Sequence, residues 1–265
     1  MKLAKVFKEN KQFTLFSILA LVVVGVAVFA PQIAPYDPLD AVMLESLQAP
    51  SSAHPFGTDK LGRDLLSRVI FGTRTSLVMT LCLVAVIFVI GTFLGVIAGY
   101  FGGIIDSVIM RIADMMISFP GLVLAIAIAG MLGPNLVNAV ISIAAVSWTK
   151  YARLARSLVM KIRDRDYVSA AIVTGSKTPY MLFRYMLPNA LPTLIITAAT
   201  DIGSMMLELA AMSFLGFGAK PPAPEWGYML NEGRACMQSA PWLMIFPGLA
   251  IFVVVVVFNM LGDSI

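Results

Sequence analysis

The sequence predicts an all-α, polytopic membrane protein with six transmembrane helices. Hydrophobic residues make up 59% of the 265 residues and charged residues only 13%, against roughly 45–50% and 25% in soluble proteins. The mean hydropathy is +0.87. A soluble protein of this size could not hide so much apolar surface, and a disordered chain would carry many more charges. Composition therefore excludes both classes.

Six apolar segments are long enough to cross a bilayer, which takes about 20 helical residues. We expect them at residues 13–29, 76–100, 105–132, 136–152, 190–215 and 243–261. The first segment follows four lysines, as a secretory signal peptide would, but its apolar run is long and no Ala-x-Ala site ends it. We therefore predict that this segment is a retained span.

The third span is the least regular of the six. Asp106, Arg111 and Asp114 interrupt its first half, whereas residues 122–132 are purely apolar. We predict one long helix with a bend at Pro120, because proline disturbs a helix interior. Arg111 and Asp114 stand three residues apart and are expected to form a local ion pair.

The distribution of charges predicts the orientation in the membrane. Residues 150–184 carry eight lysines and arginines against Asp164 and Asp166, so this loop should be cytoplasmic, as should the lysine-rich N-terminus. The loops at 35–75 and 219–239 are nearly balanced in charge and should lie outside. Trp226 lies in the second of these loops and Trp242 just after it, and both are expected in the interfacial aromatic belt.

The basic loop contains a pattern that predicts a short helix with a docking role. Asp166 favours a helix start through the positive end of the helix dipole, and Gly175 can end the helix in a left-handed conformation. Ala170 and Ala171 are small enough to let another surface approach closely. Pro188 suits the first turn of the fifth span. The structural alternative is an ordinary amphipathic helix on the membrane surface.

The spacing of Ala170, Ala171, Gly175, Leu187 and Pro188 resembles the EAA loop of binding-protein-dependent ABC importers. Ser169 stands where that pattern has Glu, and Tyr185 where it has Ile. Further blocks in the same order are similar to the second permease of the peptide and nickel importers; they lie at 54–64, 111–120, 213–218, 225–234 and 241–263. The family usually continues past its Gly-Asp pair with Arg-Asp and a Leu-Asp-Pro segment, whereas this sequence ends at Ile265.

The resemblance implies a type I ABC importer permease fold in the inner membrane. It implies residues 1–71 as tail, first span and external loop, and residues 72–265 as the permease domain with a coupling loop at about 164–189. The expected partners are a homologous second permease, two ATPase subunits, an extracytoplasmic solute-binding protein and the lipid bilayer. ATP and magnesium would bind the ATPases, since this sequence has no Gly-x-x-x-x-Gly-Lys-[Ser/Thr] loop. We therefore expect no cofactor in this chain. The ATPase-coupling residues would be Asp166, Ala170, Ala171, Gly175, Leu187 and Pro188.

Two carboxylates fall inside the fifth span. Asp201 and Glu208 are seven residues apart and share one helix face, and each costs on the order of 2.5–3.5 kcal/mol inside a membrane. We expect this face, together with Met205, to line the translocation pathway, where the carboxylates would meet a cationic part of the cargo. The structural alternative pairs each carboxylate with a basic or hydroxyl group on a neighbouring helix.

The cargo implied by the resemblance is nickel, carried as a chelate, or short peptides. Residues 201–207 resemble the nickel permeases somewhat more closely, but one histidine and two distant cysteines cannot form a nickel site. The competing function is an ion-coupled secondary transporter with Asp201 and Glu208 as its coupling site. No catalytic constellation and no basic aromatic surface is evident, so neither enzymatic activity nor nucleic-acid binding is expected.

Overall fold

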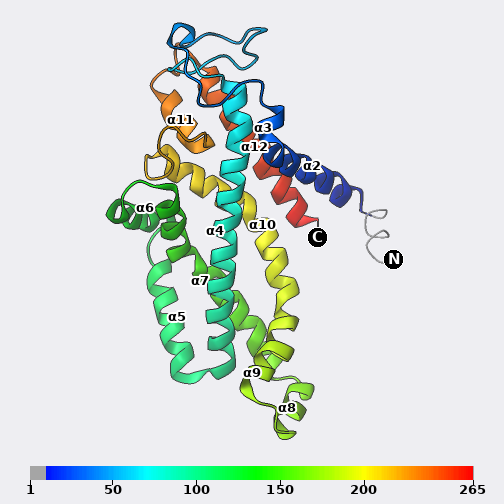
Figure 1. Cartoon of the computed structure of the whole chain (residues 1–265). Coiled ribbons are helices and arrows are strands. Elements are labelled where there is room, and N and C mark those ends of the chain that lie inside the picture. Colours follow the sequence, from blue (N-terminus) through cyan, green and yellow to red (C-terminus); the bar gives the residue numbers. More distant parts are fainter. Residues whose placement is uncertain (1–9, 265) are drawn as a thin grey trace.

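The computed structural model describes residues 10–264, and every regular element within them is a helix (Figure 1). Lys2, Lys5 and Lys8 of the predicted cytoplasmic tail, and Ile265, lie outside the described residues. The longer helices are α2 (Lys11–Val28), α4 (Leu65–Phe101), α5 (Gly103–Ile117), α6 (Gly121–Leu132), α7 (Leu136–Arg163), α10 (Leu187–Phe214) and α12 (Trp242–Asp263). Short helices lie between them: α3 (Ala30–Ile33), α8 (Asp166–Val173), α9 (Thr178–Met181) and α11 (Trp226–Arg234).

Helices lie at all six predicted spans, but not every one of them is long and apolar enough to cross a membrane. Within the described residues, four helical stretches are long and apolar enough to cross a membrane, and a fifth span results if α5 and α6 are taken together. The four include α2, α4 and α12, together with the continuous helical stretch Thr178–Phe214 that contains α10. Helix α7 occupies the place of the predicted fourth span, but polar and basic residues interrupt its apolar run and it extends to Arg163. This arrangement is consistent with six predicted helices.

The predicted third span is not one helix. The chain breaks between Ile117 and Gly121, and the axes of α5 and α6 differ by 92°. Asp114 pairs with Arg153 of α7 at 2.5 Å rather than with Arg111, so the expected local ion pair is wrong. Asp106 likewise binds Arg156 of α7 through both carboxylate oxygens. Helix α5 is therefore fastened to α7 by charge as well as by packing.

Helix α4 runs through the centre of the molecule and packs closely on α7 (Figure 1). Gly91, Gly95 and Gly99 follow one another at every fourth position and so share one helix face. A Cβ atom at Gly91 would lie 2.5 Å from the carbonyl oxygen of Trp148 and 2.5 Å from Cβ of Tyr151. Small residues allow this approach, which is how helices commonly associate in membranes.

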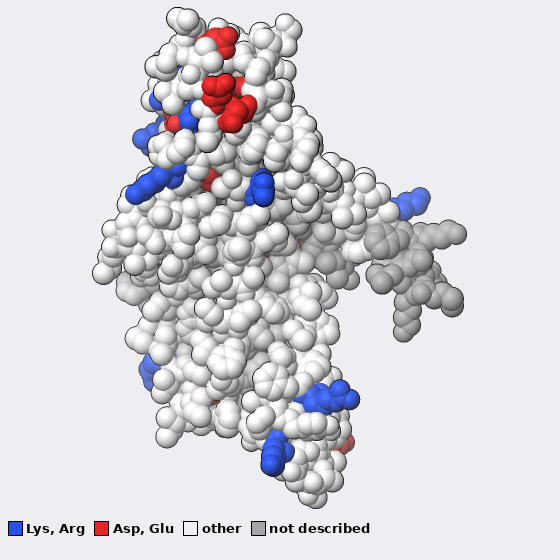
Figure 2. Space-filling model, viewed as in Figure 1, with Lys and Arg blue, Asp and Glu red and all other residues white. Residues whose placement is uncertain are grey.

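The other helices pack around α4 and against one another. Helix α10 packs on α12, and α2 lies against α12, so that the two ends of the described chain meet (Figure 1). The side-chain amide of Asn10 donates a hydrogen bond to the carbonyl of Ser264 at 3.1 Å. Charged side chains gather at the two ends of the face shown in Figure 2, with an almost uncharged band between them. Such a band is what a bilayer requires.

Candidate functional site

The loop between α7 and α10 forms the first candidate site, at one end of the molecule. Helix α8 begins at Asp166, and Gly175 follows it at φ +83°, the left-handed conformation expected for a residue that ends a helix. Ala170 is exposed, but Ala171 is buried in the same apolar cluster as Met181 and Met186. Of the two alanines, only Ala170 therefore offers a surface to a partner.

The outer face of this loop is apolar with a basic border. Tyr167, Ile172 and Val173 are exposed, the last at 87%. Exposed lysines and arginines surround them: Lys161, Arg165, Lys177 and Arg184. An exposed apolar patch with a polar border is typical of a protein interaction site. The alanine spacing in the sequence identified this loop as a docking site. It did not identify Ile172 or Val173 as part of the exposed apolar surface.

The loop re-enters the helical bundle without a clear break. After α9, residues Leu182–Met186 form a π-helical turn (η2), and α10 follows at Leu187 with Pro188 at its second position. Leu187 is half-buried and Pro188 is exposed. Helical backbone thus runs without interruption from α9 into α10.

The second candidate site is a polar cavity of about 440 Å³ between α4, α5, α6, α7 and α10. Asp201, Ser204, Met205 and Glu208 of α10 line one side of it, and Ser147, Thr149, Lys150 and Tyr151 of α7 line another. The break between α5 and α6 contributes Phe119 and Gly121. All three residues predicted for the translocation pathway therefore border one cavity.

Asp201 is fully partnered within this cavity. Lys150 Nζ lies 2.6 Å from its Oδ1, and the Tyr151 hydroxyl donates to its Oδ2 at 2.9 Å. Asp201 is 5% exposed and Tyr151 2% exposed, whereas the Lys150 side chain is 58% exposed. The pairing with a basic and a hydroxyl group on a neighbouring helix is the arrangement that the structural alternative described for Asp201.

Glu208 differs from Asp201 in its surroundings. It is half-buried, and within residues 10–264 it makes no hydrogen bond or ion pair. Met205 is buried between the two carboxylates along α10. The sequence placed both acids on one face but could not tell which of them α7 would neutralise.

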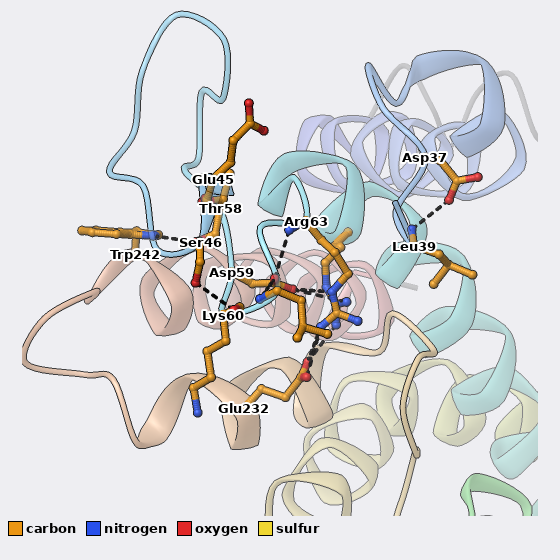
Figure 3. Close-up of polar contacts among 12 residues, drawn as sticks. Asp37, Leu39, Glu45, Ser46, Thr58, Asp59, Lys60, Arg63, Glu232 and Trp242 are labelled. Atoms are coloured by element: carbon orange, nitrogen blue, oxygen red, sulfur yellow. Dashed lines mark hydrogen bonds and ion pairs between the residues drawn. The ribbon is translucent and has the colours of Figure 1, made fainter. Parts of the chain in front are cut away.

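A network of buried ion pairs holds the other end of the molecule. Figure 3 shows Arg63 between Asp59, at 2.6 Å, and Glu232 of α11, at 3.1 Å. Arg68 also contacts Glu232, at 2.8 Å. Since both arginines are almost completely buried, this network fixes residues 59–68 against α11.

Hydrogen bonds of His54, Asp64 and Trp226 also connect the elements at this end of the molecule. His54 is buried, with Nδ1 2.9 Å from Asp64 Oδ1, and Asp64 also caps the start of α4 by accepting from the Ser67 amide. Trp226 is 1% exposed and donates from Nε1 to the Val69 carbonyl. The prediction that Trp226 lies in the interfacial belt is therefore wrong, because its ring fills the space between α4 and α11. Cys82 and Cys236 are both free.

Two family descriptions match the sequence. Residues 91–265 match "Binding-protein-dependent transport system inner membrane component", and residues 2–50 match "N-terminal TM domain of oligopeptide transport permease C". The first match contains the α8 loop and every residue that lines the polar cavity except Ile87.

Individual proteins are similar over nearly the whole chain. The dipeptide transport system permease protein of Alkalihalophilus pseudofirmus is 42% identical over 98% of this chain and 86% of its own length. The nickel transport system permease protein of Escherichia coli is 39% identical over 87% of this chain and 83% of its own. A solved structure of the MetNI methionine ABC transporter is similar in fold, with a TM-score of 0.61 at 19% identity over 75% of this chain and 94% of that one.

Proposed function

The chain belongs to the family of binding-protein-dependent transport system inner membrane components, and on that premise we propose how it works and what it carries. It is a permease subunit of an ABC importer of the peptide and nickel group, a transport component rather than an enzyme. The ion-coupled secondary transporter has no support, because the matching family works with a binding protein and its related proteins are ABC permeases.

We propose that the cargo is a nickel chelate or a short peptide, passed into the cytoplasm by alternating access. Relatives named for dipeptides, glutathione and nickel, at 39–42% identity, support this range. The proposed path runs through the cavity bordered by Asp201, Met205 and Glu208. A cavity of about 440 Å³ has the size of a small-molecule site.

The proposed complex contains a homologous second permease, two ATPase subunits that bind ATP and magnesium, and an extracytoplasmic solute-binding protein. We place the chain in the inner membrane with a cytoplasmic N-terminus and coupling loop, as the positive charge of that loop supports. We divide it into residues 1–71 and the permease domain 72–265. The end fixed by Arg63, Arg68 and Glu232 would then face the binding protein with a preformed surface.

The proposed coupling mechanism rests on the position of the α8 loop, which joins the end of α7 to the start of α10. Lys150 lies 13 residues before the end of α7, and Asp201 lies 14 residues after the start of α10, so both are about 20 Å from the loop. A push by the ATPases on α8 would be carried equally along the two helices that meet at the Lys150–Asp201 pair. Asp166, Ala170, Gly175 and Pro188 shape the surface that receives the push, and Leu187 and Ala171 pack it against the bundle.

Matched substitutions on α8 test this proposal. Ala170→Glu places a large charged group on the exposed docking face, and we expect it to lower ATP-driven uptake by the assembled importer more than tenfold, with normal membrane insertion. Ser169→Glu adds the same group at the adjacent exposed position, where the EAA pattern itself has Glu, and should preserve uptake. Ala171 is unsuitable for this test because it is buried. Uptake that survives Ala170→Glu would refute the coupling role.

A further inference from the structure

We propose that Glu208 is the subsite that receives a positively charged ammonium group of the cargo inside the membrane, and that Asp201 is not available for this role. The inference rests on the proposed function, because it assigns the chemistry of the cargo path. It also specifies the part of the cargo that the cavity recognises.

The charges around the cavity separate the two acids. Lys150 and Asp201 cancel each other at 2.6 Å, and Tyr151 occupies the second oxygen of Asp201. Glu208 has no ion-pair or hydrogen-bond partner in the part of the chain that the structure describes. Ionisable groups inside membranes pair with one another or face a water-filled cavity. Glu208 lines the cavity, and when it is ionised its charge has no hydrogen-bond or ion-pair partner within residues 10–264.

The spacing of the charges suits a small zwitterion. Seven residues of α10 separate Asp201 from Glu208, which places their Cα atoms about 10 Å apart along one helix face. The ammonium of Lys150 stays at the Asp201 end, and its side chain is 58% exposed. An extended dipeptide spans about 7 Å and a tripeptide about 10 Å. Such a cargo is long enough to place its ammonium at Glu208 and its carboxylate at Lys150, whose ammonium has three N–H donors and uses one of them on Asp201.

The same lining does not suit a bare metal ion. Nickel prefers imidazole and thiolate ligands, but the cavity presents carboxylates, hydroxyls and the thioethers of Met116 and Met205. Residues 10–264 hold no group of three His, Cys, Asp or Glu side chains placed to bind a metal. A single free carboxylate opposite an ammonium instead matches the α-amino end of a peptide, with which it forms a charge-assisted hydrogen bond.

The test uses the complete importer, purified with its second permease and ATPases and reconstituted with its binding protein in proteoliposomes. Radiolabelled L-alanyl-L-alanine is one probe, and ⁶³Ni²⁺ supplied with L-histidine is the other. We expect Glu208→Gln to lower ATP-driven Ala-Ala uptake about tenfold or more, the effect of one charge-assisted hydrogen bond. Glu208→Asp keeps the charge and should retain most of the uptake.

The outcomes separate this inference from the proposed function. Wild-type Ala-Ala uptake by Glu208→Gln, with normal assembly on size exclusion, would overturn the inference, and so would an equal loss in Glu208→Asp. Uptake of nickel–histidine without Ala-Ala by the unchanged complex would overturn it as well. Each of these results leaves an ATP-driven importer. Only the absence of ATP-driven uptake of both probes by the unchanged complex would refute the proposed function itself.

Discussion

Replacing Gly95 by alanine tests the close contact between α4 and α7 on which the bundle depends. A Cβ atom at this position would lie 2.7 Å from Cβ of Ala155 and closer still to the carbonyl oxygen of Ala152. Since carbon atoms pack best at about 3.5–4.0 Å, the added methyl group requires α4 and α7 to separate by about 1 Å. No rotamer change relieves this contact, because the opposing atoms are backbone and a methyl group.

The expected cost follows from this overlap. Overpacking of a well-filled core costs about 1–3 kcal/mol, and the helix preference of alanine over glycine returns up to about 1 kcal/mol. Gly25→Ala in α2 is the matched control, since its Cβ would meet no atom within 4 Å. The helix preference is common to both variants, so the difference between them isolates the overlap. At roughly 2–4 °C for each kcal/mol in a protein of this size, Tm should differ by about 2–12 °C.

The assay is thermal unfolding of the purified protein in detergent, followed by fluorescence-detected size exclusion. Gly95→Ala should unfold at a lower temperature than both the unchanged protein and Gly25→Ala. Equal Tm values for the two variants would show that α4 and α7 can separate without cost, and the argument from glycine spacing would be wrong.

Three further substitutions address the polar clusters. Tyr151→Phe removes the hydroxyl that donates to Asp201 and should cost about 1.5–3 kcal/mol in detergent thermal unfolding; an unchanged Tm would mean that water replaces the hydroxyl. Burial raises the pKa of Glu225, so the folded state binds a proton more tightly than the unfolded chain, and stability should fall as pH rises above about 4.5. Glu225→Gln should flatten this decline, as measured by Tm from pH 4.5 to 7, and an equally steep decline would contradict the assignment. Glu232→Gln leaves two buried arginines partly uncompensated, so limited proteolysis should cut the loop at residues 35–64 faster than in the unchanged protein; equal protection would remove the network from the account of this end.

The sequence predicted the helices well where hydropathy alone decides the structure. Helices α2, α4, α10 and α12 overlap their predicted spans. A long apolar segment in a bilayer must satisfy its backbone hydrogen bonds internally, and a helix does so. The break at Pro120 was expected only as a bend. The angle of 92° between α5 and α6 depends on how α6 packs against α7. The sequence at residues 117–121 does not predict that packing.

The candidate sites were predictable only where the local sequence decides the structure. Gly175 and the α8 helix follow from local conformation, and the structure confirms both. The partners of Asp114 and Asp201 lie 39 and 50–51 residues away, and sequence spacing identifies only neighbours on one helix. The burial of Trp226 was missed because its pocket is formed by α4, far earlier in the chain.

The right-angled break between α5 and α6 has a consequence for how the membrane stays sealed. Backbone outside a helix is tolerated at membrane depth only where protein covers it or water reaches it, and Phe119 and Gly121 at this break border the polar cavity. In the proposed complex, this part of the protein must therefore either be reached by water through the cavity or be covered by a partner subunit. Where water fills the cavity, the barrier that prevents ions from leaking across the membrane must lie above or below the cavity and not at the cavity itself.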